Sequence, residues 1–448
     1  MFERIAITLP EILQEDARLV IRALECGYSR VHLRKPEASE EEVAGIIEQI
    51  PVRFRSRISI HYYPELAVRY GLGGIHLNQR SNKVPEGFIG LVSRSCHCLE
   101  ELEKYKRECD YLFLSPVYDS ISKKGYKSNF SKETLKKAAG QGIIDSKVYA
   151  LGGVDESKAE ELETLGFGGG AMLGCVWDRL VTPPAVLTIA GSDCSGGAGI
   201  QADIKTISAF GCYAASVITA VTAQNTLGVH SVEAVSPAMI REQMLAVFED
   251  LDICAVKTGM IYDIQTAEAI TDILEKYQDI PVVCDPVMVS TSGSVLMKDD
   301  CRKYVEKVLF PLCSLITPNL NEASLLAGCL INTVEQMKET ALLLSERYGC
   351  AVLIKGGHLE GDSMCDILYD GTLHVFETAK VHSTNLHGTG CTLSSAIASR
   401  LALDSLSLCR SALPLADAVG AAKTYIQTAI SKAGRMHIGN GNGPLWHF

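Results

Sequence analysis

The chain has 448 residues, more than one typical domain, so two or three domains are expected. Its formal net charge of −11 argues against a nucleic-acid partner held by phosphate contacts. Apolar runs are far shorter than the roughly 20 residues that a membrane span needs, and the first residues lack a signal-peptide pattern. We therefore expect a cytoplasmic protein without a membrane partner.

Short β-rich runs alternate with helical stretches over residues 1–180. Amphipathic helices are expected at Glu15–Cys26 and Ser39–Ile50, and Ser39 followed by Glu42 predicts a capping box. The expected strands are Ile5–Thr8, Arg30–Arg34, Ile58–His61, Gly74–Leu77, Ile89–Ser93, Tyr111–Pro116, Val148–Gly153 and Gly170–Gly174. Eight such units predict a (β/α)8 TIM barrel.

Two consecutive prolines, Pro183 and Pro184, follow this part and favour an extended chain. We place a linker at residues 181–185 and a second domain at residues 186–448. Its expected strands are Val186–Ala190, Ala215–Ala220, Ala255–Gly259, Val282–Pro286, Ser314–Pro318 and Ala351–Lys355. They predict an α/β domain with a mostly parallel central sheet and a site at the carboxyl ends of the strands.

Two glycine-rich segments of the second domain open helices, Ala190–Asp203 and His387–Cys391. Glycine lets the backbone approach a ligand closely. The backbone N–H groups at the start of the second helix predict an anion hole that stabilises a transferring phosphoryl group. Cys391 is a candidate general base or substrate contact, since a helix N-terminus can lower a thiol pKa. A small residue packed under the loop is the alternative.

Acidic residues and a lysine follow other strands of this domain. Asn319 and Glu322 share one face of a first helical turn, and Asp285 ends another strand. These oxygens suit Mg²⁺ near phosphates, although Asn319 and Glu322 could also form a helix capping box. Lys355 ends a third strand, where its ammonium group could meet the phosphates of ATP.

Together these motifs resemble the hydroxymethylpyrimidine and phosphomethylpyrimidine kinases, a branch of the ribokinase-like superfamily. The resemblance covers Val186–Phe448 and implies two successive ATP-dependent phosphorylations with ATP and Mg²⁺ as cofactors. It places Gly388, Thr389, Gly390 and Cys391 at the transferred phosphate. It assigns to the pyrimidine pocket Gly191, Asp203, Gln224, Met260 and Val287. A pyridoxal kinase is the alternative within the same class.

Candidate residues in the barrel lie near the carboxyl ends of its strands, where barrel phosphate sites form. Arg34 could pair with a diphosphate, and His97 follows the fifth strand. The candidate phosphate contacts are Ser120, Ser122, Lys123 and Gly153.

The region Ile5–Trp177 resembles thiamine phosphate synthase and its relative, the thiazole tautomerase. The synthase joins a pyrimidine diphosphate to a thiazole phosphate. Arg34 matches its pattern, but His61-Tyr62 and Asn78 stand where it has two Mg²⁺-binding carboxylates. His97 matches the proton-transfer histidine of the tautomerase. The barrel is therefore a divergent synthase, a tautomerase or a non-catalytic ligand-binding domain.

The expected partners are small molecules only, namely hydroxymethylpyrimidine, its phosphate and thiazole phosphate. A homodimer is the expected assembly, because closed twofold dimers are the commonest oligomers.

Overall fold

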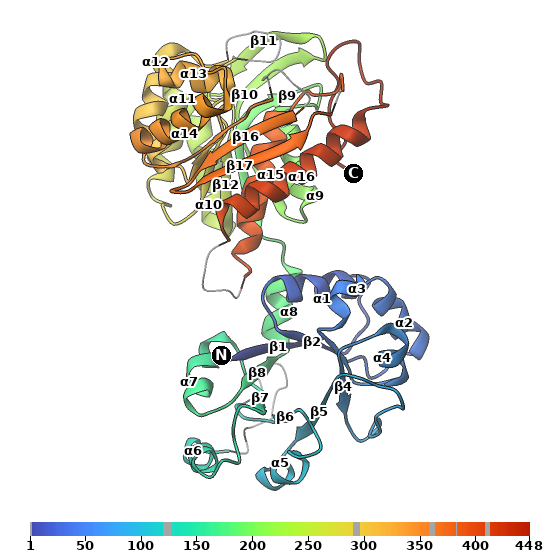
Figure 1. The fold of residues 1–448 in the computed structure, drawn as a ribbon. Coiled ribbons are helices and arrows are strands. Elements are labelled where there is room, and N and C mark those ends of the chain that lie inside the picture. Colours follow the sequence, from blue (N-terminus) through green and yellow to red (C-terminus); the bar gives the residue numbers. More distant parts are fainter. Residues whose placement is uncertain are drawn as a thin grey trace. The chain divides into compact units, whose positions relative to one another are not determined.

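The computed structural model describes residues 2–119, 128, 130–289, 296–357, 363–381, 383–407 and 413–448. The chain divides into two compact units. The first is Met1–Thr182 with the short segment Leu406–Arg410, and the second is Pro183–Ser405 with Ser411–Phe448. Figure 1 shows the helices and strands of both units. In the described part of the chain, no helix has both the length and the apolar character that crossing a membrane requires.

The first unit is a closed barrel of eight parallel strands, as the sequence predicted (Figure 1). Each strand pairs with the next, and β8 pairs with β1 to close the ring. The strands are β1 (Glu3–Ile7), β2 (Arg30–Leu33), β3 (Ile58–Ile60), β4 (Gly74–Leu77), β5 (Leu91–Cys96), β6 (Tyr111–Leu114), β7 (Val148–Leu151) and β8 (Gly169–Met172).

Successive side chains along each strand point alternately into the barrel and toward the helices, so the barrel has two apolar layers. Ile5, Ile7 and Phe113 belong to a cluster inside the ring, while Val31 and Leu33 belong to the larger cluster under the helices. The helices are α1 (Asp16–Glu25), α2 (Glu40–Glu48), α3 (Val52–Arg55), α4 (Glu65–Tyr70), α5 (Leu99–Tyr105), α6 (Lys132–Gly140), α7 (Ala159–Thr164) and α8 (Gly174–Val181).

Local helix signals in the barrel match the predictions. Ser39 caps α2, and the reciprocal bonds of the capping box with Glu42 are both present. No helix lies between β4 and β5 among the described residues, and the sequence had no clear helical pattern there.

The second unit is built on a nine-stranded sheet, with the strand order β11-β10-β9-β12-β13-β14-β15-β16-β17. The pairings from β10 through β15 are parallel, whereas β11, β16 and β17 add antiparallel edges. The strands are β9 (Ala185–Asp193), β10 (Tyr213–Asn225), β11 (Gly228–Ala234), β12 (Ile253–Thr258), β13 (Val282–Cys284), β14 (Leu315–Ile316), β15 (Ala351–Ile354), β16 (Ser363–Tyr369) and β17 (Leu373–Ala379).

Helices cover both faces of this sheet (Figure 1). Val186 of β9 packs in a cluster with residues of α9, α15 and α16, and the next residue, Leu187, packs in the cluster on the opposite face with α10, α11, α13 and α14. The helices are α9 (Gly199–Ala209), α10 (Pro237–Asp250), α11 (Ile264–Leu274), α12 (Asp299–Tyr304), α13 (Leu320–Ala327), α14 (Val334–Tyr348), α15 (Thr389–Asp404) and α16 (Leu415–Ala433). This burial on both faces explains the continuous apolar runs of the central strands.

Candidate functional site

A cavity of about 590 Å³ opens at the carboxyl ends of the parallel strands of the second unit. It is the place where a parallel α/β sheet binds its ligand. The predicted residues that line it are Gly191, Gln224, Met260, Asp285, Val287, Asn319, Glu322, Lys355, Gly388, Thr389, Gly390 and Cys391. Tertiary folding therefore brings twelve predicted positions, from seven separate segments, to one cavity.

The start of α15 forms one wall of this cavity. Gly388 is the N-cap residue, with a φ of 84° that glycine adopts without strain. A Cβ there would lie 2.0 Å from the carbonyl oxygen of Gly197, and a Cβ at Gly390 would lie 3.0 Å from a carboxylate oxygen of Asp285. Glycine at both positions keeps this wall free of side chains at the first turn of α15, whose N–H groups have no intrahelical acceptor.

The thiol of Cys391 differs from the sequence expectation. Burial raises its pKa to about 11, and the nearby Lys257 ammonium group opposes this only in part. The helix N-terminus does not lower the pKa below its ordinary value, because the desolvation of a thiolate outweighs it. In the free protein this group is a protonated thiol at neutral pH.

Asp203 does not line the cavity, unlike the other residues that the sequence analysis assigned to the pyrimidine pocket. It is fully buried and lies in a polar network under the cavity floor. Its carboxylate accepts hydrogen bonds from Thr188 at 2.6 Å and Ser395 at 2.7 Å, and it pairs with Lys257 at 2.8 Å. All of its contacts are within the protein, so its role is to hold α9, α15, β9 and β12 together.

A cationic and acidic group lies at the ends of β13, β14 and β15. Lys355 Nζ pairs with Asp285 at 2.7 Å. Asn319 and Glu322 form the reciprocal capping box of α13: the Asn319 N–H donates to Glu322 Oε2 at 2.8 Å, and the Glu322 N–H donates to Asn319 Oδ1 at 2.9 Å. The two residues therefore cap the helix and also line the cavity. Burial, with a contribution from Asp285, raises the pKa of Glu322 to about 7. These two carboxyl groups oppose each other's ionisation. A divalent cation bound to both would relieve the repulsion between their charged forms.

The amide of Gln224 forms part of the opposite wall. Its Nε2 lies 3.1 Å from His387 Nε2, and its Oε1 accepts from the Thr222 hydroxyl at 3.2 Å. His387 also pairs with Asp193 at 2.9 Å. Burial opposes ionisation of Asp193, but hydrogen bonds from His387, Ser195 and the backbone outweigh it and lower its pKa to about 2.

In the barrel, Arg34 follows β2 and His97 follows β5, both at the carboxyl ends of strands. His97 is exposed, and its Nδ1 lies 3.0 Å from the carbonyl oxygen of Ser115. Gly153 has a φ of 63°, and a Cβ there would lie 2.3 Å from the carbonyl oxygen of Asp119. The predicted phosphate contacts Ser120, Ser122 and Lys123 lie outside the described residues.

Inside the barrel, three buried histidines form a cluster that the sequence did not indicate: His32, His61 and His76. His32 bonds to His61 at 2.9 Å and to the hydroxyl of Tyr111 at 2.7 Å. Burial lowers the pKa of all three rings, so they are neutral at physiological pH.

Two family models match separate parts of the chain. The phosphomethylpyrimidine kinase model matches residues 193–446. The chain belongs to the phosphomethylpyrimidine kinase family. The thiamine monophosphate synthase model matches residues 5–176, which lie in the barrel. The second unit is therefore called the kinase unit below.

Curated relatives share one or both parts. A hydroxymethylpyrimidine/phosphomethylpyrimidine kinase of Rhizobium meliloti is 49% identical over 264 residues, which cover 58% of this chain and 96% of the relative. The thiamine biosynthesis bifunctional protein ThiED of Geobacter sulfurreducens is 37% identical over 408 residues, 86% of this chain and 81% of the relative. The chain thus has the two-part organisation of a bifunctional thiamine biosynthesis protein.

Among solved structures, the ADP complex of Bacillus subtilis pyridoxal kinase is 33% identical, with a TM-score of 0.53 over 59% of this chain and 98% of the other. A Staphylococcus aureus pyridoxal kinase in complex with pyridoxal is 31% identical, with a TM-score of 0.52 over 59% of this chain and 94% of the other. The likeness confirms the ribokinase-like fold of the kinase unit.

Sequence reasoning named the segment His387–Cys391 but not His387 as a site residue, and it missed Asp193, Asp366 and Lys423. All four line the cavity of the kinase unit. Asp366 and Lys423 form a buried ion pair between β16 and α16. The two residues lie far apart in the chain, so no local pattern could pair them, whereas Asp193 stood inside a motif already recognised.

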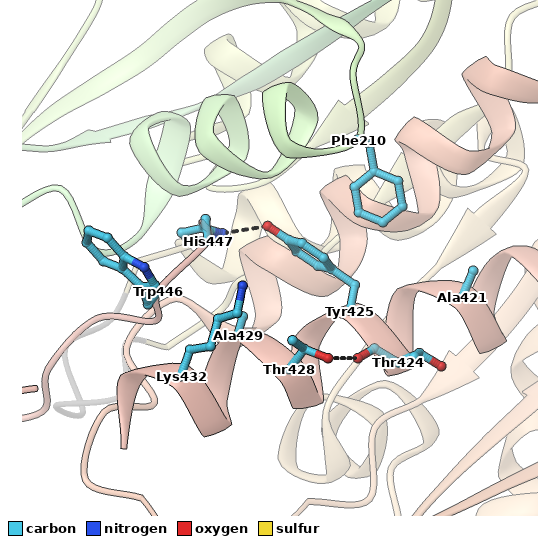
Figure 2. Close-up of a pocket in the computed structure, with 9 residues that line it drawn as sticks. All are labelled: Phe210, Ala421, Thr424, Tyr425, Thr428, Ala429, Lys432, Trp446 and His447. Atoms are coloured by element: carbon cyan, nitrogen blue, oxygen red, sulfur yellow. Dashed lines mark hydrogen bonds between the residues drawn. The ribbon is translucent and has the colours of Figure 1, made fainter. Parts of the chain in front are cut away.

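A second, smaller cavity of about 310 Å³ lies beside α16, away from these motifs (Figure 2). His447 Nδ1 lies 3.0 Å from the Tyr425 hydroxyl there, and burial lowers the pKa of His447 to about 4. The residues that line it include no carboxylate. It offers no set of groups for phosphoryl transfer.

Proposed function

We propose that the kinase unit phosphorylates 4-amino-5-hydroxymethyl-2-methylpyrimidine and then its monophosphate, with ATP as the phosphoryl donor. The observation that carries this is the convergence, in one cavity, of the α15 N-terminus, the Lys355–Asp285–Glu322 group and the Gln224 amide. An amide offers both a donor and an acceptor, which suit a ring nitrogen beside an amino group. The small and apolar residues that would contact the rest of the pyrimidine are Gly191, Met260 and Val287.

Each end of the cavity has its own task in this proposal. The N–H groups of Gly390 and Cys391 stabilise the charge that develops on the transferred phosphoryl group, whereas the N–H of Thr389 donates to the carbonyl oxygen of Leu386 at 3.3 Å. Lys355 holds phosphate oxygens. Asp285 and Glu322 would hold Mg²⁺, which would neutralise phosphate charge. Cys391 lies at the start of α15 and, in its minor thiolate form, accepts the proton of the substrate hydroxyl group as the new bond forms.

We infer that the barrel joins the pyrimidine diphosphate to thiazole phosphate and releases pyrophosphate. Support comes from the synthase match over residues 5–176 and from the bifunctional relative. Arg34 and Gly153 at the carboxyl ends of strands are the proposed anion contacts. A tautomerase is the competing function, since His97 follows β5 with its Nδ1 bonded to a backbone carbonyl.

One reaction tests both proposals. The full-length protein is incubated with hydroxymethylpyrimidine, Mg-ATP and thiazole phosphate, and the products are identified by mass spectrometry. Mono- and diphosphorylated pyrimidine together with thiamine phosphate are expected. If phosphorylated pyrimidine forms without thiamine phosphate, the synthase proposal is wrong and the tautomerase remains. If no phosphorylated pyrimidine forms and pyridoxal is turned over in a parallel reaction, the unit is instead a pyridoxal kinase, an enzyme with the same fold.

A further inference from the structure

The strand ends at which the synthase pattern has its two Mg²⁺-binding carboxylates carry no carboxylate in this chain. Arg34, His61 and Asn78 follow β2, β3 and β4. The Asn78 side chain is used within the protein: Nδ2 donates to the carbonyl of His61 at 2.7 Å, and Oδ1 accepts from the backbone N–H groups of Arg80 and Ser81, both at 2.9 Å. Mg²⁺ prefers carboxylate and phosphate oxygens. A guanidinium, an imidazole and a bonded amide do not fit it.

The histidine cluster does not fit a metal ion either, although its members are the one group of three potential ligand side chains in the described part of the chain. The rings of His61 and His76 are stacked, with centroids 4.1 Å apart and planes 23° apart. Lone pairs lie in the ring plane, so stacked rings do not converge on one ion. Both nitrogens of His76 are also bonded, to Ser93 and Ser95 at 2.9 Å each.

The hydrogen bonds of His32 and His61 instead form part of a chain through the barrel interior. Arg30 Nη1 lies 3.3 Å from the Ser59 hydroxyl, which lies 3.3 Å from the Tyr111 hydroxyl. Tyr111 lies 2.7 Å from His32 Nε2, and His32 Nδ1 lies 2.9 Å from His61 Nε2. The chain runs from the first residue of β2 to the residue that follows β3.

The direction of this chain follows from its proton donors. A guanidinium group only donates, and within the chain each buried hydroxyl proton has its own acceptor only if it is donated to the next member. Ser59 accepts from Arg30 and donates to Tyr111, which donates to His32 Nε2. The proton of His32 is then on Nδ1, where it is donated to His61 Nε2. The proton of His61 must therefore be on Nδ1, pointing away from the chain. Hydrogen bonds aligned in this way polarise one another and strengthen the last donor.

Nδ1 of His61 is available to a ligand. It makes no hydrogen bond to any described residue, and it is not among the enclosed polar atoms that lack a partner. The Arg34 guanidinium is close enough to His61 to contribute to the low pKa of this ring. A positive charge and a fixed N–H donor thus lie at neighbouring strand ends.

We propose that the barrel carries out its reaction without a bound divalent cation, and that Arg34 and the Nδ1–H of His61 bind the diphosphate leaving group in place of the metal. The proposal rests on the synthase function given above. In the reaction the bond between the pyrimidine methylene carbon and the diphosphate oxygen breaks, and its electron pair leaves with pyrophosphate. The lone pair of the thiazole nitrogen forms the new carbon–nitrogen bond. No proton is transferred, since Arg34 supplies charge and His61 a hydrogen bond to the departing oxygen.

Chelation provides the first test. The full-length protein receives chemically prepared pyrimidine diphosphate and thiazole phosphate, in Mg²⁺ or in excess EDTA, so that the kinase unit is not needed. We expect the rate of thiamine phosphate formation in EDTA to stay within about twofold of that in Mg²⁺, because none of these strand ends is a Mg²⁺ ligand. Phosphorylation of hydroxymethylpyrimidine by the same preparation should stop in EDTA, which confirms that chelation is complete.

The outcomes separate this proposal from the one on which it rests. Loss of coupling by about tenfold or more in EDTA means that a metal carries the leaving-group charge and overturns the proposal. If no thiamine phosphate forms in either condition, the proposed synthase function is wrong, and the metal-independent mechanism is wrong with it.

The second test measures the tautomer of His61 directly. In protein with ¹⁵N-labelled histidine, the nitrogen shifts of His61, assigned with a His61→Gln variant, should show the proton on Nδ1; a proton on Nε2 overturns the proposed direction. Tyr111→Phe removes the donor to His32 and should lower kcat roughly fivefold to tenfold with KM unchanged. Tyr149→Phe is the matched control, because Tyr149 lies in the same interior cluster but outside the hydrogen-bonded chain. Equal effects of the two variants contradict a role for the chain.

Discussion

At the scale of single residues, the kinase cavity depends on side chains whose ionisation is set by burial rather than by residue type. The Cys391 thiol has a pKa raised to about 11 and the Glu322 carboxyl a pKa raised to about 7. Both groups are protonated to a greater extent at neutral pH than the free amino acids, because the cavity walls exclude water from their charged forms.

The Cys391 thiol provides the first prediction. If it accepts the substrate proton, Cys391→Ala should lower kcat roughly 100- to 10,000-fold, the usual contribution of a general base. The wild-type rate should rise with pH toward the raised pKa of the thiol. Cys391→Asp should retain part of the activity and lose that alkaline rise, since its carboxylate is already ionised. Near-normal turnover of the alanine variant would refute the assignment.

The Gln224 amide provides the second prediction. Gln224→Leu keeps a similar volume but removes the donor and the acceptor, so KM for the pyrimidine should rise about tenfold, the effect of roughly one hydrogen bond. KM for ATP should stay unchanged. Leu325→Ala, which alters another residue of the cavity wall, is the comparison. An equal rise in both KM values would contradict a specific contact with the pyrimidine.

Glu322 gives a pH dependence of stability. Its folded-state pKa of about 7 lies above the ordinary 4.5. Between these values the unfolded chain releases a proton that the folded protein keeps, so the free energy of unfolding falls as pH rises and the loss is complete above about pH 7. The melting temperature of the wild type, relative to Glu322→Gln, should therefore fall between pH 5 and pH 8. A constant difference across that range would show that the pKa is not raised.

At the scale of elements, the start of α15 is the part of the kinase unit most restricted by its backbone. Gly388→Ala places a Cβ 2.0 Å from the Gly197 carbonyl oxygen at a φ of 84°, which strains the loop by about 1–3 kcal/mol. Activity should be lost to a greater degree than stability. Gly328→Ala is the control, since Gly328 has a φ of 73° with no atom within 4 Å of the new Cβ. The control should lower stability and leave kcat intact, measured by melting and initial rates.

Most elements of the central sheet were predictable because their residues are buried on both faces and read as continuous apolar runs. The strands β11, β16 and β17 were missed. In β17 exposed and partly buried residues alternate along its whole length. Such a strand at the edge of a sheet carries a weak apolar signal, and its pairing with β16 is decided by tertiary packing rather than by local sequence.

At the scale of the whole kinase unit, the Asp203 network connects segments distant in sequence. Asp203 of α9 pairs with Lys257 of β12 and accepts from Ser395 of α15, all without exposure to solvent. Because removing one partner leaves a buried unpaired charge, Asp203→Leu should cost roughly 3–5 kcal/mol of stability.

The double variant Asp203→Leu/Lys257→Met completes this prediction. It should recover much of the lost stability, because no unpaired charge remains. Chemical denaturation of the two variants and the wild type measures both changes. A double variant less stable than Asp203→Leu would show that the ion pair is not the source of the effect.

The sequence by itself determined the barrel, the parallel sheet and the positions of the glycine-rich motifs. These depend on local periodicity, on glycines at turns and on residues close together in the chain. Only the tertiary structure decided that Asp203 lies under the cavity, that the Cys391 thiol stays protonated, and that His32 and His61 meet inside the barrel. Burial and contacts between distant segments set these properties, and neither is encoded in a local pattern.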